Sequence, residues 1–144
     1  MDKKEAALHH VKAFAFLAKA SSNHWVAVES MHHGEPAAAT GPMELVLVAL
    51  GGCTGADVAN ILEKKRAAFT RFEINISGER AETHPKVFTK IHIEYILEGK
   101  DLRASDVEQA IELSQSTYCS VSAMLKKTAE ITCSYKLLKS PDAQ

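Results

Sequence analysis

Two cysteines, Cys53 and Cys119, lie 66 residues apart in settings that could support thiol chemistry. Cys53 follows an apolar, helix-like run that turns glycine-rich at Gly51 and Gly52, and Cys119 has small or hydroxylic neighbours. Neither belongs to a CxxC pair with metal-site spacing. A cysteine reacts as its thiolate, and an oxidised thiol condenses with a nearby second thiol to a disulfide. The pair therefore predicts a dithiol redox site.

The surroundings of the two thiols suggest different roles. Beside Cys53 the glycines remove side-chain bulk, Thr54 is a candidate hydrogen-bond donor, and an apolar pocket could be built from Leu47, Val48 and Leu50. Cys119 precedes a helical segment, and a helix N-terminus stabilises thiolate, which fits a resolving role. The alternative stays open, because buried cysteine commonly acts as a small hydrophobe.

Two further residues are interpreted as structural. Asp57 lies one turn after Cys53, and a carboxylate there would raise the pKa of the thiol, so we assign it to helix polarity or to packing between helices. Cys133 alternates with Ile131 and Tyr135 in a final strand and is expected in the core.

Bulk composition excludes several classes of protein. The 144 residues fit one domain, residues 1–144. The net charge of -1 gives no excess of positive charge of the kind that binds nucleic acid. No run approaches the roughly 20 apolar residues of a membrane span, and the N-terminus lacks a signal-peptide core. We therefore expect a cytoplasmic protein whose three cysteines are reduced.

The pattern of elements predicts an α+β fold in the order ββ-α-ββ-αα-β. A Ser105-x-x-Glu108 capping box is expected to open the second helix. The first helix is apolar almost all round in its first half, so a second subunit is expected to help bury it. The expected strands are 8–18, 24–30, 72–83, 86–98 and 130–138, and the expected helices are 43–66, one from about 105, and one from about 118.

Two segments resemble the cysteine motifs of the OsmC/Ohr family. The run Gly41–Val58, which includes Leu50-Gly51-Gly52-Cys53-Thr54, looks like the first cysteine helix of that family. The segment Tyr118–Leu125, followed by Lys126 and Lys127, looks like the second motif. The element order matches over nearly the whole chain, and the likeness is closest to the YhfA-like branch.

The resemblance implies an OsmC-like intertwined homodimer, with antiparallel sheets wrapped around long central helices and active sites at the subunit interface. It also implies thiol-dependent reduction of hydroperoxides, preferably organic ones, with an external dithiol reductant and no metal, haem or flavin. By motif position, Cys53 is the peroxidatic cysteine and Cys119 the resolving one.

The sequence departs from the family pattern at two places. The glutamate that follows the helix-opening proline in Ohr and OsmC is here Met43, with Glu44 one residue later, and one helical residue is a rotation of about 100°. We keep Glu44 as a candidate polar organiser of the site. No arginine precedes Arg66, so the cation of the N-terminal hairpin would have to be a lysine or histidine. The candidates are Lys12, Lys19 and His24.

These departures keep two rival functions open. One is a protein of the same fold that binds a hydrophobic small molecule or lipid with little peroxidase activity. The other is a structural dimer in which both cysteines are core residues.

Overall fold

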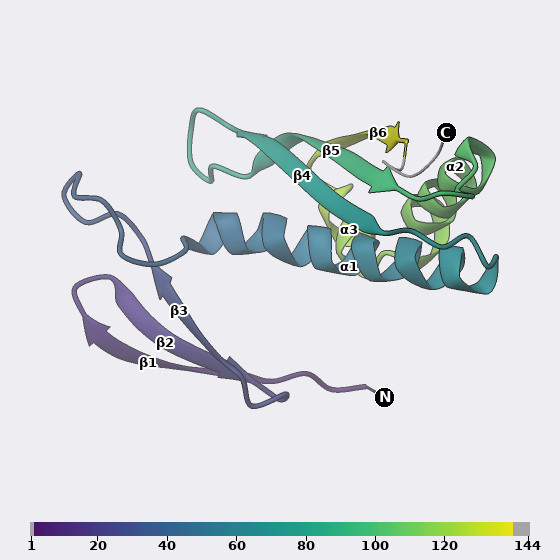
Figure 1. Ribbon diagram of the computed structural model, residues 1–144. Helices are drawn as coiled ribbons and strands as arrows, with labels where there is room; N and C mark the ends of the chain where they lie inside the picture. The colour runs from purple at the N-terminus through teal and green to yellow at the C-terminus, as the bar shows by residue number, and fades with distance from the viewer. Residues whose placement is uncertain (1, 140–144) are drawn as a thin grey trace. The chain divides into compact units, whose positions relative to one another are not determined.

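The computed structural model of the chain describes residues 2–139, with mixed helices and strands (Figure 1). It divides into two compact units, and the division falls between Val46 and Leu47, inside the long helix α1. The elements are β1 (Ala6–Lys12), β2 (Ala15–Ala20), β3 (Trp25–Glu29), α1 (Pro42–Lys64), β4 (Arg71–Arg80), β5 (Phe88–Glu98), α2 (Ala104–Leu113), a π-helical turn η1 (Ser114–Tyr118), α3 (Ser120–Leu125) and β6 (Glu130–Leu138).

The first unit is an antiparallel sheet in the order β1-β2-β3. The single strand expected over residues 8–18 is wrong, because the chain reverses between β1 and β2 at Ala13 and Phe14. Ala13 adopts a φ of 45°, a left-handed conformation that normally favours glycine or asparagine. The turn therefore carries no recognisable residue signal. The returning strand expected over 24–30 is confirmed as β3.

One face of this sheet is apolar. Strand register aligns Leu8, Ala18 and Val26 in one row across the three strands, and Phe16 pairs with Val28 in the next row. Residues in such rows share a face because side chains alternate along each strand. Leu8, Phe16 and Val26 are nevertheless exposed in the single chain. A sheet face of this kind is normally covered by another layer.

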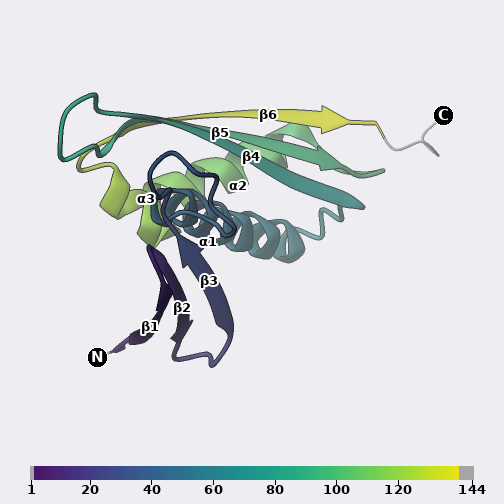
Figure 2. The same cartoon turned by 90° about the vertical axis from the view of Figure 1, so that its left-hand side faces the viewer.

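The second unit is built on a sheet in the order β4-β5-β6, with helices on one face (Figure 2). β4 and β5 are antiparallel, but β6 runs parallel to β5, unlike the antiparallel sheets expected. The reason is the helical crossover through α2, η1 and α3, which returns the chain to the starting end of β5. The predicted core face of β5 is confirmed by its four buried side chains, Ile91, Ile93, Tyr95 and Leu97.

Glycines let β4 lie close to α1. A Cβ atom at Gly51 would be 3.1 Å from Cδ1 of Ile76, and one at Gly55 would be 3.0 Å from Cδ1 of Ile74. The two glycines are four residues apart and so share one side of the helix. A Cβ at Gly52, by contrast, would meet nothing within 4 Å. Gly51 therefore serves packing between helix and sheet.

The start of α2 differs from the expected capping box. The N-cap is Arg103, in extended conformation and without a side-chain cap, and Ser105 already lies inside the helix. The acidic side chain of Asp106 occupies the first turn instead, where negative charge is favoured by the helix dipole.

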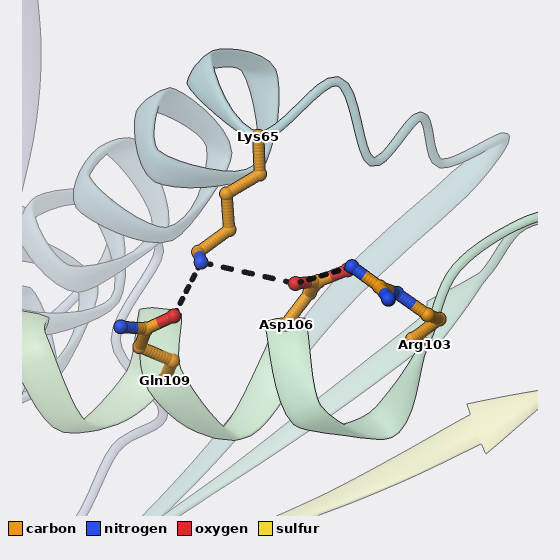
Figure 3. Close-up of polar contacts among 4 residues, drawn as sticks. All are labelled: Lys65, Arg103, Asp106 and Gln109. Atoms are coloured by element: carbon orange, nitrogen blue, oxygen red, sulfur yellow. Dashed lines mark hydrogen bonds and ion pairs between the residues drawn. The ribbon is translucent and has the colours of Figure 1, made fainter.

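Asp106 also joins the end of α1 to the start of α2 (Figure 3). Its carboxylate accepts a hydrogen bond from Nε of Arg103 at 3.1 Å and lies 3.8 Å from Nζ of Lys65. Lys65 additionally donates to the side-chain oxygen of Gln109. Asp106 is only 8% exposed, so these contacts offset the cost of removing its charge from water.

The position of Cys133 differs from the one expected. Cys133 is exposed in the chain, so the expected core position is wrong. β6 is an edge strand, and its residues are covered less completely than those of the central strand β5.

Of the helices in residues 2–139, α1 is long and apolar enough to cross a bilayer by length and composition. Core helices pass the same test, and Leu50, Val58 and Leu62 of α1 are fully buried in this chain.

Candidate functional site

The second unit brings the two motif cysteines together. Cys53 comes from α1, and Cys119 stands at the start of α3. Their Sγ atoms and a carboxylate oxygen of Asp57 all lie within 4.8 Å of one another. Both cysteines are free thiols. A disulfide needs a bond of about 2.05 Å, so the sulfurs are neighbours that must still approach to form one.

Cys119 is the more enclosed thiol, at 3% exposure. It is the N-cap of α3, and its Sγ accepts a hydrogen bond from the backbone N–H of Ser122 at 3.4 Å. Burial raises the pKa of the Cys119 thiol to about 11, the Ser122 N–H offsets this in part, and the Cys53 thiol and the Asp57 carboxylate add to the rise. The expected lowering by the helix N-terminus is therefore outweighed by desolvation.

Cys53 is half-buried. The predicted hydrogen bond from Thr54 to Cys53 is not formed. The Thr54 hydroxyl is fully buried on the other side, 2.6 Å from Oη of Tyr95 and 2.8 Å from Oγ of Ser114. It therefore belongs to the polar core behind the thiols.

That polar core connects Asp57 with the helix that carries Cys119. Ser114 donates to Oδ2 of Asp57 at 2.9 Å. Gln115 donates to Thr54 at 3.2 Å and accepts from Oγ of Ser122 at 2.6 Å. Ser114 and Gln115 both belong to the π-helical turn η1, a rare geometry that often occurs at functional sites. The contacts hold α1, η1 and α3 in a fixed relation around the sulfurs.

Sequence reasoning missed most of this network. Asp57 was assigned to helix polarity or interhelical packing, and the structure places it between α1 and η1, beside both thiols. A signal did exist: Tyr95 lies on the apolar face of β5, Ser114 directly follows α2 in line with its buried Val107, Ala110 and Ile111, and buried hydroxyls need partners.

A pocket of about 360 Å³ has Asp57 among its lining residues, which include neither cysteine. Its walls include apolar groups of Ile61, Leu113 and Tyr118, together with the cationic Lys64. Because the Asp57 carboxylate also lies beside both sulfurs, the pocket and the thiols are neighbours.

The apolar pocket expected from Leu47, Val48 and Leu50 does not form beside Cys53. Leu47 and Val48 line a separate groove of about 350 Å³ with Gly51 and residues of β4. Gly52 also lines this groove, but Cys53 is not among its lining residues. Leu50 is fully buried in the core.

Glu44 is not part of the three-residue group formed by Cys53, Asp57 and Cys119. Its Oε1 accepts a hydrogen bond from the backbone N–H of Gly41 at 2.9 Å, at the start of α1. Its role in catalysis stays a prediction. So does a cationic role for Lys12, Lys19 or His24, all of which belong to the first unit.

Comparison with known proteins adds an independent line of evidence. The sequence model described as "OsmC-like protein" matches residues 32–134. Protein YhfA of Escherichia coli K12 is 37% identical over 134 residues, which cover 93% of this chain and 98% of YhfA.

Solved structures show the same fold. A hypothetical protein from Aquifex aeolicus superposes with a TM-score of 0.85 at 34% identity, covering 97% of this chain and 99% of the other. The organic hydroperoxide resistance protein OsmC from Legionella pneumophila superposes with a TM-score of 0.72 at 13% identity, covering 94% and 98%. At that low identity the second likeness shows the fold alone.

Proposed function

The chain belongs to the OsmC-like protein family, and from this premise we propose that it is a thiol-dependent reductase of organic hydroperoxides. The observation that carries the proposal is the approach of Cys53 and Cys119 to within 4.8 Å. A fold relative from Legionella is an organic hydroperoxide resistance protein, which supports the same substrate class.

The proposed cycle has three steps. The Cys53 thiolate attacks one peroxide oxygen, so that an S–O bond forms, the O–O bond breaks, and the alkoxide takes up a proton to leave as alcohol. The Cys119 sulfur then attacks the Cys53 sulfenic acid, which forms the disulfide and releases water. Finally an external dithiol reduces the disulfide and becomes oxidised itself.

The environments of the two thiols support this division of roles. Cys53 is half-buried and reachable, whereas Cys119 is almost fully enclosed. With its pKa raised to about 11, the Cys119 thiol is protonated at neutral pH and is a poor first nucleophile. A resolving thiol reacts only after a sulfenic acid has formed beside it, so enclosure next to Cys53 suits that role.

The organic group of the substrate is assigned to the pocket that adjoins Asp57. Ile61, Leu113 and Tyr118 supply apolar surface there, and Lys64 supplies a positive charge at its edge. Glu44 is retained as a candidate polar organiser.

The reductase is further proposed to be a cytoplasmic homodimer. The apolar sheet face of Leu8, Phe16 and Val26 is exposed in the single chain, and exposed apolar patches commonly mark interfaces. The cytoplasm fits the cycle because its reductants keep thiols reduced and regenerate a catalytic pair.

A second candidate is a protein that binds a hydrophobic small molecule or lipid. The groove of Leu47, Val48, Ile74 and Ile76 favours it, because this groove is apolar and neither motif cysteine lines it. In that case ligand binding is independent of both cysteines, and peroxide is not consumed.

Peroxide consumption by the reduced protein tests the proposal. With dithiothreitol as reductant, we expect repeated turnover of cumene hydroperoxide, and slower turnover of hydrogen peroxide because it has no organic group to occupy the pocket. Consumption at the rate of the reductant alone would contradict the proposal. Lipid retained in native mass spectra would then support the second candidate.

A further inference from the structure

We propose that the reduced thiol pair and Asp57 form a binding site for a thiophilic divalent cation, with Zn²⁺ as the metal that fits the donor set. The proposed ligands are the two sulfurs and one carboxylate oxygen, which lie within 4.8 Å of one another. The metal is not a cofactor of the peroxidase cycle. It occupies the same sulfurs and blocks them.

The donor set suits zinc in number and kind. Zinc takes thiolate sulfur at about 2.3 Å and carboxylate oxygen at about 2.0–2.2 Å, so the ligand atoms of a tetrahedral site lie about 3.5–3.8 Å apart. The ligand atoms lie within 4.8 Å of one another, so metal binding requires them to approach by roughly 1 Å at most. Cys53 and Asp57 are half-buried, which leaves the fourth position open to water or a solute.

Neighbouring hydrogen bonds orient the proposed ligands. Ser114 donates to Oδ2 of Asp57 at 2.9 Å, which fixes the carboxylate and leaves its other oxygen available. The Ser122 N–H points at the sulfur of Cys119 at 3.4 Å. Outer contacts of this kind hold ligands in place and tune metal affinity. They come from η1 and α3 and are already formed without metal.

Charge balance also favours a cation. None of the ion pairs found among residues 2–139 involves Asp57. A donor set of two thiolates and one carboxylate carries three negative charges, and a divalent cation offsets two of them.

Metal occupancy has a consequence that rests on the proposed reductase function. A sulfur bound to zinc is not free to attack peroxide, so zinc inhibits turnover. Chains that have released zinc at equilibrium remain reactive: an organic hydroperoxide converts their two thiols to a disulfide and is itself reduced to alcohol and water, and the disulfide no longer binds the metal. The site would then couple peroxide exposure to zinc release.

Metal titration of the reduced, chelator-treated protein tests the site without any peroxide. We expect one Zn²⁺ per chain, measured by competition with a chromogenic chelator. Titration with Co²⁺ should give a thiolate charge-transfer band that zinc abolishes. Cys53→Ser and Cys119→Ser should each weaken affinity by more than about ten-fold, since even loss of an outer-shell partner costs about 10–100-fold. Asp57→Asn should weaken it as well, and Cys133→Ser should leave it unchanged.

Several results would overturn the metal site. The first is the absence of stoichiometric zinc binding by the wild type. The second is a cobalt spectrum without a thiolate charge-transfer band. The third is equal zinc affinity in wild type, Cys53→Ser and Cys119→Ser. The cobalt spectrum of the wild type keeps the test valid even if a variant fails to fold. Turnover of peroxide in chelator is measured separately, so failure of the metal site and failure of the reductase function are distinguishable.

Discussion

The sulfur atoms of Cys53 and Cys119 lie within 4.8 Å of each other although they belong to α1 and to the start of α3. Polar contacts rather than a covalent bond hold this arrangement. Asp57 accepts from Ser114, and Gln115 bonds Ser122, so the helix of each cysteine is tied to the same π-helical turn. The free thiols are thereby positioned before any oxidation takes place.

Thiol labelling should separate the two cysteines. In a Cys133→Ser background at pH 7.5, we expect Cys53 to react with N-ethylmaleimide well before Cys119. The raised pKa of Cys119, about 11, leaves about 100-fold less thiolate than an ordinary cysteine, and burial slows access further. Intact mass at timed quenches should therefore show one modification at first, with the second appearing on unfolding. Equal labelling rates would contradict the enclosed position of Cys119.

Alkaline pH should destabilise the fold through Tyr95. Burial raises the pKa of Tyr95 above the value of about 10 that tyrosine has in an unfolded chain. Below about pH 10 both states hold the proton, but above it the unfolded chain loses its proton first, so the free energy of unfolding falls as pH rises. Urea unfolding at pH 8.5 to 11 measures this trend.

Tyr95→Phe is the variant that tests the assignment. It should lessen the alkaline fall, although the raised pKa of Cys119 still contributes to it. It should also lower stability at neutral pH by about 1–2 kcal/mol, because Thr54 loses a buried partner at 2.6 Å. The exposed Tyr118 supplies a control, and Tyr118→Phe should keep the wild-type alkaline trend. An unchanged trend in Tyr95→Phe would remove Tyr95 as its source.

The Asp106 contacts should contribute measurably to stability. We expect Asp106→Ala to lower the free energy of unfolding by about 1–2 kcal/mol, because Arg103 and Lys65 lose their shared, mostly buried partner. Glu73→Ala, which breaks the exposed pair with Arg71, is the matched control and should change stability less. Urea denaturation at pH 7 compares them. Equal effects would show that burial of Asp106 is immaterial.

The proposed dimer predicts that two faces of the N-terminal sheet respond differently to charge. Val26→Asp places a carboxylate on the face of Leu8 and Phe16, whereas Ala27→Asp places the same group on the opposite face, in the row of His9 and Leu17. Light scattering coupled to gel filtration should give twice the chain mass for wild type and Ala27→Asp, and a monomer or insoluble protein for Val26→Asp. A monomeric wild type would contradict the dimer.

Periodicity and motifs predicted much of the fold, because their signals are local. The helix expected over 43–66 is α1, the strand over 130–138 is β6, and the alternating face of β5 forms the core. The errors arose where tertiary contacts override local signals. Ala13 turns the chain without a turn residue, and Arg103 begins α2 where Ser105 was expected to cap it.

The proximity of the two candidate cysteines was predicted from the sequence, their catalytic roles stay a prediction, and their surroundings were not predicted. Motif likeness identified Cys53 and Cys119, whereas the position of Asp57 beside them depends on how η1 packs against α1. The contact of Thr54 with Tyr95 and Ser114 likewise joins three distant segments. Residue spacing does not predict contacts between distant segments. For this reason the prediction that Thr54 donates a hydrogen bond to Cys53 is wrong.

The most direct test of the reductase account is the fate of the two sulfurs under peroxide. Reduced protein in the Cys133→Ser background is treated with stoichiometric cumene hydroperoxide, and intact mass and peptide mapping follow. The account predicts a loss of about 2 Da and one Cys53–Cys119 linkage within a single chain, since disulfide formation removes two hydrogens. Cys53→Ser should consume no peroxide, and Cys119→Ser should accumulate a sulfenic or sulfinic acid at Cys53. Unchanged mass in the parent protein, or peroxide consumption by Cys53→Ser at the parent rate, would contradict the account.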